Sequence, residues 1–299
     1  MGNEDLGAFY YSIGDLAAAQ LAFSRMRDYC TLSDHVAQMS LKLILVSVAQ
    51  RTWAAVQLLF HKIEQLNLRP SEYERIKPGL WACEGLSHMA TGSYFAAAKS
   101  FLRVGANYTS SEAQDGIAFD RDVLTGNDVA VYGGLCALAS MNRAELQSGV
   151  LGNPDFRQFL EMEPHVRRAI SLFCASKFSA CLGILQEYRN DWLLDIYLHP
   201  IVDELFELVR AKCLVQFFVP FRTVSLAELE RAFPPRQYPR GSVTVEKVSA
   251  ENDAVSAESN DRQGASRKIE DELTDMIRAG DLNARLDLVD KVSIMYRFC

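Results

Sequence analysis

The chain has 299 residues, of which 49% are hydrophobic and 23% charged, so it can bury a sizeable core and has the charge content of an ordinary soluble protein. Its formal net charge of -7 argues against broad binding to nucleic acid, which needs a basic surface. No apolar run reaches the roughly 18 to 20 residues that span a bilayer, so no membrane-spanning segment is predicted.

The first 26 residues predict a helix, a turn and a second helix. Gly14 is placed to end the first helix, and Asp15 is placed to cap the second. The apolar face of the second helix would consist of Leu16, Ala19 and Phe23. Because Gly7 and Ala19 are small, the two helices can cross closely.

The same plan returns further along the chain. Gly85–Phe101 repeats it with Gly92 at the stop and Ser93 at the cap. Leu45–Phe60 is a degenerate copy, and Ile170–Leu185 is a weaker one that keeps only the apolar spacing. A single hairpin of this size cannot bury its apolar face, so the copies must stack as an α-solenoid that loosely resembles tetratricopeptide repeats. The alternative is an ordinary helical domain in which alanine recurs by chance.

Two central stretches invite a chemical interpretation. Residues 105–127 are polar and acidic, but the carboxylate spacing fits no calcium loop, so a solvated connector is predicted rather than a cation site or an acid–base pair. Next, Gly133 and Gly134 interrupt a helical pattern. No strand precedes them and no lysine follows in the register of a phosphate-binding loop, so the pair predicts a close contact between helices.

The seven cysteines form no CxxC pair and lie in apolar surroundings, which predicts reduced thiols in the core. The chain also has no HxH pair with a downstream aspartate and no other metal-ligand cluster. The stretch Gly85-Leu86-Ser87-His88-Met89 lacks the closing glycine of a nucleophile elbow and falls in a predicted helix, so it is expected on a helix surface. The sequence therefore predicts no catalytic residue, no cofactor and no metal.

The last eighty residues predict a winged helix. A long helix ends at Pro220, and Ser225 caps a short helix. Residues 236–266 are too polar to bury a core and are read as a flexible insertion. A further helix is expected over Arg267–Ala279. The alternating stretches that follow predict a β-hairpin, with apolar positions Leu286, Leu288, Val292, Ile294 and Tyr296.

The predicted architecture is thus mainly α, with a helical-repeat domain over residues 1–127 and a second domain over residues 128–299. The second domain would comprise a helical part over 128–220 and a winged helix over 221–299.

A helical solenoid that runs into a winged helix resembles the PCI family, the scaffold subunits shared by the proteasome lid, the COP-nine signalosome and translation initiation factor three. The stretches VSLAELERAF and IEDELTDMIRAGDLNARLD are similar to the wing entry and closing motif of that family. Three further stretches resemble signalosome members more than proteasome-lid members: GDLAAAQLAFSRMRDYCT, DVAVYGGLCALAS and DKVSIMYR. The sequence departs from the family at the insertion 236–266, where members have a short connector.

The resemblance implies a non-catalytic scaffold subunit that supports cullin deneddylation and the regulation of cullin-RING ubiquitin ligases, while the protease activity belongs to another subunit. Other PCI-domain subunits would be its direct partners, and cullin-RING ligases indirect ones. Cytoplasm and nucleus are the expected compartments, since Met1-Gly2 opens no secretory signal and Leu6 breaks the myristoylation pattern.

The expected subunit interface is the hairpin, at Leu286, Leu288, Val292, Ile294 and Tyr296. The last three would pack inward, while the backbone of an edge strand would pair with a neighbouring subunit.

Two other functions fit the same elements. The chain could be a PCI scaffold subunit of the proteasome lid. It could also be a winged-helix reader of nucleic acid, but its expected recognition helix carries the carboxylates Glu270, Asp271, Glu272 and Asp275. These would repel a phosphate backbone, so neither nucleic acid nor a membrane is an expected partner.

Overall fold

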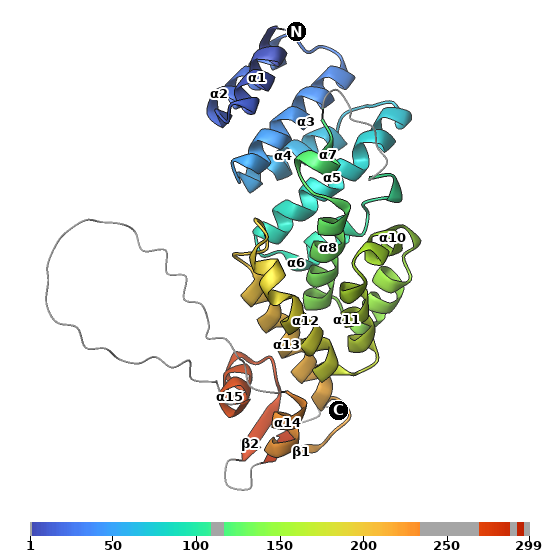
Figure 1. Cartoon of the computed structure of the whole chain (residues 1–299), viewed down its shortest axis with the longest axis vertical. Coiled ribbons are helices and arrows are strands. Elements are labelled where there is room, and N and C mark those ends of the chain that lie inside the picture. The colour runs from blue at the N-terminus through green and yellow to red at the C-terminus, as the bar shows by residue number, and fades with distance from the viewer. Residues whose placement is uncertain (1, 109–116, 234–268, 288–291, 296–299) are drawn as a thin grey trace, which may run out of the picture.

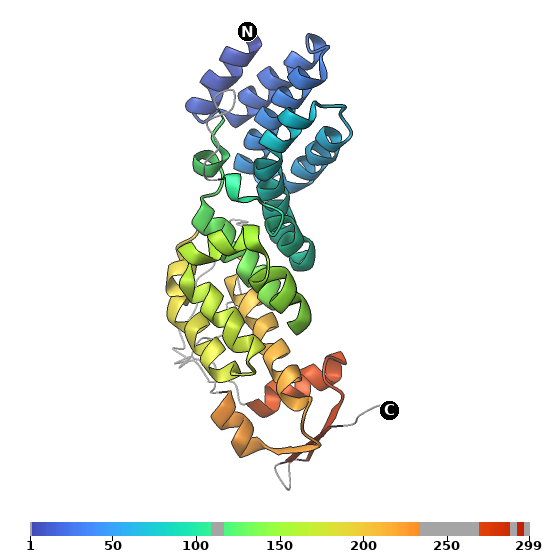
Figure 2. The same cartoon turned by 90° about the vertical axis from the view of Figure 1, so that its right-hand side faces the viewer.

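The computed structural model of the chain describes residues 2–108, 117–233, 269–287 and 292–295. Helices are stacked along one long axis, and a small unit that contains a β-sheet lies at the end opposite to the N-terminus (Figure 1). The turned view shows the same elongated stack (Figure 2). The predicted architecture, mainly α with a helical-repeat region and a winged helix, is confirmed. Within the described ranges, no helix has the length and apolar character needed to cross a bilayer.

The N-terminal half is built from helices that each pack against the next along the chain. They are α1 (Gly2–Ser12), α2 (Leu16–Arg25), α3 (Ser33–Ala49), α4 (Trp53–Glu64), α5 (Pro70–Ala90) and α6 (Tyr94–Phe101), with a 3-10 turn η1 (Met26–Asp28) after α2. Such nearest-neighbour packing is the hallmark of a solenoid, in which each hairpin buries its apolar face against the next one.

The predicted repeats share one turn. Gly14, Arg51, Gly92 and Ser176 all have positive φ, at 83°, 56°, 77° and 60°. In each case this residue donates its N–H to the carbonyl three residues back, and the next residue donates to the carbonyl five residues back. In each repeat an apolar residue of the second helix lies nine positions after the positive-φ residue. These apolar residues are Phe23, Phe60, Phe101 and Leu185. Four hairpins therefore reuse one helix-ending geometry, a Schellman-type cap.

The small residues of the repeats make close helix contacts. A Cβ atom on Gly7 would lie 2.4 Å from the ring of Phe23, and one on Gly85 would lie 2.9 Å from the ring of Phe101. These separations are shorter than carbon atoms tolerate, so the aromatic ring occupies the space that a side chain would need. The predicted close crossing is present, and its contact is between the glycine and the phenylalanine in both repeats.

Replacing Arg51 or Ser176 with glycine should stabilise the fold. Both side chains are exposed, and a left-handed backbone is strained for any residue that carries a Cβ. We expect each substitution to raise the free energy of unfolding by about 0.5–1 kcal/mol, after the extra entropy of glycine in the unfolded chain is allowed for. Thermal unfolding followed by circular dichroism measures this. Gly14→Ala and Gly92→Ala should change stability in the opposite direction, and a stabilising effect of either would contradict the account.

The segment that follows α6 is more buried than the sequence indicated. It contains a 3-10 turn η2 (Ala106–Tyr108) and the short helix α7 (Phe119–Asp122), while residues 109–116 lie outside the described ranges. Tyr108, Phe119 and Leu124 are buried, and the Tyr108 hydroxyl lies 2.7 Å from the carbonyl oxygen of Leu124. The prediction of a solvated connector was therefore wrong for these residues, because apolar side chains alternate with the acidic ones.

Helix α8 (Gly126–Ser140) is the central helix of the second half and packs on α6 and α5 as well as on the helices that follow it. Thr125 and Asp128 form a capping box at its start. The expected close contact at the glycine pair is confirmed, because a Cβ on Gly134 would lie 2.3 Å from Val166 Cγ1 and one on Gly133 would lie 2.8 Å from the ring of Phe156.

The remaining helices surround α8. They are α9 (Arg143–Glu145), the π-helical turn η3 (Leu146–Leu151), α10 (Pro154–Met162), α11 (Pro164–Cys174), α12 (Phe178–Leu193) and α13 (Val202–Phe218). One hydrophobic core runs without interruption from α3 to β2, so the boundary between 127 and 128 does not separate two cores and stays a prediction. Cys83, Cys136, Cys174, Cys181 and Cys213 are free thiols buried in this core, as predicted. Cys30 is only half-buried, so the prediction was wrong for it, and Cys299 lies outside the described residues.

The C-terminal unit has the predicted winged-helix elements and one more. It contains β1 (Thr223–Ser225), α14 (Leu226–Ala232), α15 (Ile269–Ala279), β2 (Ala284–Asp287) and β3 (Val292–Met295). Ser225 accepts a hydrogen bond from the Glu228 N–H and thus caps α14 as expected. The strand β1 was not predicted, so the sheet has three strands rather than two, in the order β1-β3-β2. The insertion 236–266 lies outside the described residues.

Candidate subunit-interaction surfaces

The predicted interface strand does not lie at an edge of the sheet. β3 pairs antiparallel with β1 on one side and with β2 on the other, and Ile294 stands opposite both Thr223 and Arg285. The expectation that this part of the hairpin offers free backbone groups was therefore wrong. The two outer strands of the described sheet are β1 and β2, and a neighbouring sheet would have to pair with one of these.

The register also assigns the hairpin positions to faces. Directly opposite residues of an antiparallel pair share a face of the sheet. Leu286 lies on the face of Ala284 and of Val224, which are buried, and it packs against the core. Thr223 and Arg285, whose backbone positions both stand opposite Ile294, are exposed.

The expectation that Val292 and Ile294 pack inward concerns side chains outside the described structure, so it stays a prediction. Leu288 and Tyr296, the other two predicted interface residues, lie outside the described residues.

Helix α15 has a buried side and an acidic side. Ile269, Leu273 and Met276 are buried. Glu272 was expected on the acidic surface, but it is buried and its Oε1 lies 2.9 Å from Nε of Arg210 in α13. Sequence reasoning missed this ion pair because its members are 62 residues apart. Asp271 remains on the exposed side of α15, where carboxylates oppose binding to a phosphate backbone.

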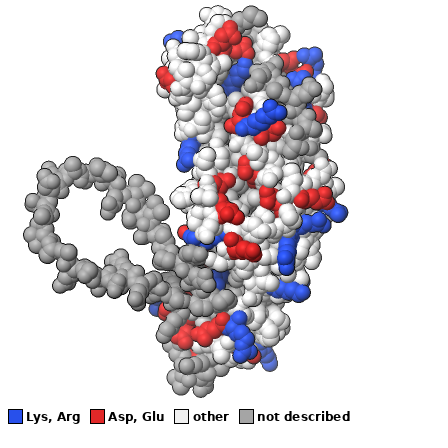
Figure 3. Space-filling model, viewed as in Figure 1, with Lys and Arg blue, Asp and Glu red and all other residues white. Residues whose placement is uncertain are grey.

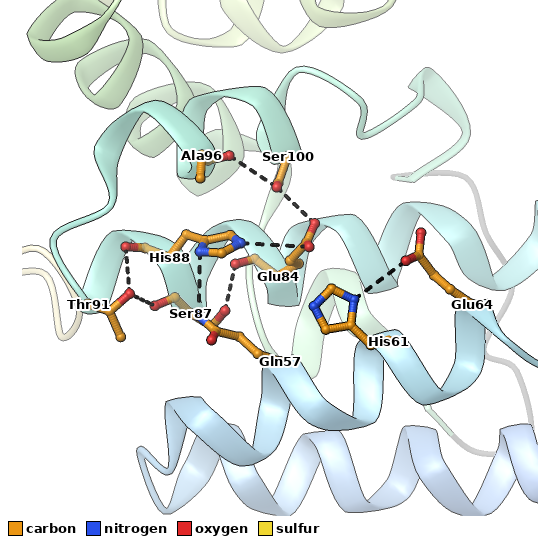
Figure 4. Close-up of polar contacts among 9 residues, drawn as sticks. All are labelled: Gln57, His61, Glu64, Glu84, Ser87, His88, Thr91, Ala96 and Ser100. Atoms are coloured by element: carbon orange, nitrogen blue, oxygen red, sulfur yellow. Dashed lines mark hydrogen bonds and ion pairs between the residues drawn. The ribbon is translucent and has the colours of Figure 1, made fainter.

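A polar network is enclosed between α4, α5 and α6 in the repeat region (Figure 4). Ser100 donates a hydrogen bond of 2.9 Å to the buried Glu84 carboxylate, and His88 Nε2 lies 3.7 Å from the other carboxylate oxygen. Gln57 in α4 contacts His88, with 3.4 Å between Gln57 Nε2 and His88 Nδ1. Burial raises the pKa of Glu84, while the hydrogen bond from Ser100 and the charge of His88 oppose that rise. The network joins three successive helices.

Ser87 is buried in the same region and donates its hydroxyl to the Glu84 carbonyl oxygen at 2.8 Å. The expectation that this short stretch lies on a helix surface was wrong for Ser87. Its hydroxyl bonds to the turn of its own helix and is closed off from solvent, which is a structural role rather than that of a nucleophile. Among the described residues, no group of three or more His, Cys, Asp and Glu side chains is arranged to hold a metal ion.

The substitution Glu84→Gln should raise stability at neutral pH. A carboxyl group whose pKa is raised on folding contributes stability below its unfolded pKa, and this contribution is lost as the pH rises through the folded pKa. Glutamine keeps an acceptor for Ser100 without the buried charge. We expect a melting temperature roughly 2–4 °C above that of the unmodified chain at pH 7, with the difference shrinking towards pH 4. Glu74→Gln, at an exposed position of α5, is the control and should show no such pH dependence.

Comparison with protein families gives two matches. Residues 1–149 match the family model of the 26S proteasome subunit RPN7, and residues 185–297 match that of the PCI domain. The second match contains α13 and the whole described winged helix.

Similar proteins from several organisms carry one name. The chain is 44% identical over 294 residues to a protein of Emericella nidulans named COP9 signalosome complex subunit 1, which covers 98% of this chain and 54% of that protein. It is 34% identical over 293 residues to the protein of the same name from Neurospora crassa, covering 97% of this chain and 60% of that one. An Arabidopsis thaliana protein of that name is 38% identical over 234 residues, which is 78% of this chain and 51% of the relative.

The chain thus spans about half the length of the curated relatives it matches. Helical repeats, a winged helix with a three-stranded sheet and a PCI match over the corresponding residues agree with one another. The chain contains a PCI domain over residues 185–297, and over most of its length it is similar to proteins named COP9 signalosome complex subunit 1.

Proposed function

We propose that this chain is a non-catalytic scaffold subunit of a COP9 signalosome, that it supports cullin deneddylation through assembly with other PCI-domain subunits, and that it acts in cytoplasm and nucleus. The observation that supports this most is the similarity to subunit 1 proteins along 97–98% of the chain, together with the PCI match. Cullin-RING ligases would be reached through the complex rather than bound directly.

The winged-helix sheet offers the contact surface in this proposal. β1 and β2 can each extend into a neighbouring sheet, since strand addition uses backbone hydrogen bonds for affinity. The exposed side chains of Thr223 and Arg285 lie on these two outer strands and can contact the same neighbour. The predicted interface residues Val292 and Ile294 belong to the strand between them, whereas Leu286 packs against the core.

Affinity purification of the tagged chain from a cell that contains a signalosome tests the assignment. The expected result is recovery of other signalosome subunits, as identified by mass spectrometry, and cleavage of the ubiquitin-like modifier from a cullin by the purified complex. Recovery of proteasome-lid subunits instead would favour the alternative scaffold assignment. Recovery of the chain without any PCI-domain partner would refute the proposal.

The double substitution Thr223→Lys and Arg285→Glu should weaken that assembly. Both side chains are exposed on the proposed contact face, so a change of charge there alters the interface without disturbing the core. We expect at least a tenfold loss of partner recovery, as measured by quantitative mass spectrometry of the purified complex. Arg27→Glu, exposed at the opposite end of the molecule, is the matched control. Equal recovery of partners by both variants would exclude this face as the interface.

A further inference from the structure

The second half of the molecule contains a pocket that the scaffold assignment does not use. It has a volume of about 290 Å³ and lies between the start of α8, the α10–α11 junction and the end of α12. Its lining residues, which define the carboxylate–aromatic pocket, are Asn127, Asp128, Val131, Glu163, His165, Tyr188, Asp191, Trp192 and Asp195. Figure 3 shows Asp and Glu side chains gathered about halfway along the visible face of the molecule, at the height of α8. This volume suits one long side chain rather than a large cofactor.

The wall of the pocket includes a stack of three rings. The rings of His165 and Tyr188 are 3.9 Å apart and inclined by 11°, and Trp192 lies 5.8 Å from His165 at 29°. Burial lowers the pKa of His165, which keeps its ring neutral at neutral pH. A stack of neutral, electron-rich rings attracts a flat cation placed against it.

The carboxylates of the pocket differ in what they already bind. Asp195 accepts hydrogen bonds from the Tyr132 hydroxyl and from the backbone N–H groups of Tyr197 and Leu198, which fixes its position. Asp128 caps α8. Glu163 faces the His165 ring, and Asp191 is exposed at the end of α12. No lysine or arginine lines the pocket, so its negative charge is available to a cation from outside.

One buried atom in the pocket wall lacks a hydrogen-bond donor. Glu163 Oε2 lies 3.3 Å from His165 Nδ1, which favours the tautomer with the proton on Nδ1. The other ring nitrogen, Nε2, is then an acceptor, and it is buried without a hydrogen-bond partner in the described structure. Buried polar atoms of this kind are rare in folded proteins, and a donor from a ligand would satisfy this one.

The chain segment next to the pocket is apolar and unusually exposed. Leu194 and Ile196, which flank the pocket residue Asp195, are 85% and 69% exposed. Large aliphatic side chains beside a charged pocket are typical of a protein-binding surface, where they exclude water from the central contact. A negatively charged pocket bordered by exposed aliphatic side chains favours, as its ligand, a cationic side chain of another protein over a free metal ion or a small metabolite.

We propose that the carboxylate–aromatic pocket binds the guanidinium group of an arginine that a partner protein presents between apolar residues. The planar guanidinium can stack on the ring wall and pair with the carboxylates of Asp191 and Glu163. A lysine ammonium has no plane to stack and would gain less. This surface lies on the helical part of the chain, so it adds to the interface proposed for the winged helix and does not depend on it.

Isothermal titration of the full chain with short peptides tests this proposal. The probe is the tripeptide Leu-Arg-Leu, blocked at both ends, and the matched control replaces its arginine with citrulline, which has the same shape and no charge. We expect the arginine peptide to bind at least ten times more tightly than the citrulline peptide, and more tightly than the corresponding lysine peptide. Equal binding of the arginine and citrulline peptides, or no binding at all, would overturn the proposal. Equal binding of arginine and lysine would overturn the choice of guanidinium.

Two substitutions in α12 test whether the arginine peptide binds in the carboxylate–aromatic pocket. Asp191→Asn should weaken the binding of the arginine peptide about tenfold, because it removes one charge at an exposed position. Glu187→Gln makes the same change one turn earlier on α12, outside the pocket, and should leave the affinity within a factor of two. Unchanged melting temperatures of both variants establish that folding is intact. A loss of affinity equal in both variants would show a diffuse charge effect and contradict the pocket.

Discussion

Replacing Glu272 with alanine is expected to destabilise the C-terminal unit by about 3–5 kcal/mol. The Arg210–Glu272 pair connects α13 to α15, and the two side chains are only 11% and 7% exposed. Removal of the carboxylate breaks this buried ion pair, and taking away one member of a buried pair is far more harmful than the loss of an exposed one. Hydrogen exchange of the α15 backbone amides should therefore accelerate by a factor of about 10² to 10³.

The same pair offers a control that separates charge from packing. The double variant Arg210→Met, Glu272→Leu replaces both charges with apolar side chains of similar volume, and such replacements of buried ion pairs are often neutral or stabilising. We expect α15 in this variant to exchange at nearly the rate of the unmodified chain. If the double variant exchanged as fast as Glu272→Ala, the electrostatic explanation would fail.

The second large effect is expected at Gly134. Its replacement by valine should destabilise the chain by about 3 kcal/mol, because the new Cβ would lie 2.3 Å from Val166 Cγ1 and the centre of α8 has no room to shift. Helix α8 packs on α6, α10, α11 and α13, so a displacement would disturb the contacts between both halves of the molecule. Urea unfolding followed by far-ultraviolet circular dichroism measures the change.

Gly183 provides the matched control for that experiment. It also lies inside a helix, α12, but a Cβ at this position would meet no atom within 4 Å. Gly183→Ala should therefore stabilise the chain by about 0.5–1 kcal/mol, since alanine favours the helix over glycine. A stabilising effect at Gly134 would show that the space around this residue does not decide the outcome, and a destabilising effect at Gly183 would contradict the open space found there.

The repeats could be predicted because their signal is local. A glycine, a capping residue and an aromatic residue recur at fixed spacing, and the glycine–aromatic contact forms twice, as in Gly7–Phe23. The cap is weaker than predicted, because Asp15 accepts a hydrogen bond from the Ala18 N–H whereas the Ser93 side chain makes no capping hydrogen bond. Arg51 and Ser176 show the limit of this reasoning. Neither residue type favours the left-handed conformation, yet both adopt it because the stacked helices on either side impose the turn.

Features that depend on distant residues could not be predicted. The strand β1 has only three residues and forms because β3 pairs with it across about seventy positions of sequence. Its presence moves β3 from the edge to the centre of the sheet, so the backbone at Val292 and Ile294 is paired with a strand on both sides. The Arg210–Glu272 pair and the ring stack at His165 likewise join separate helices, and no periodicity within one helix reveals them.

The order of the strands makes the sheet dependent on the one that is synthesised last. β1 and β2 are not hydrogen-bonded to each other, and β3 supplies the ladder for both. While a ribosome is producing the chain, the stacked helices can pack as soon as they emerge. The strands β1 and β2 cannot pair in the sheet until β3 has also been synthesised. A shortened translation product that ends before Val292 would thus display two unsatisfied strands together, and quality-control chaperones would recognise it by that defect.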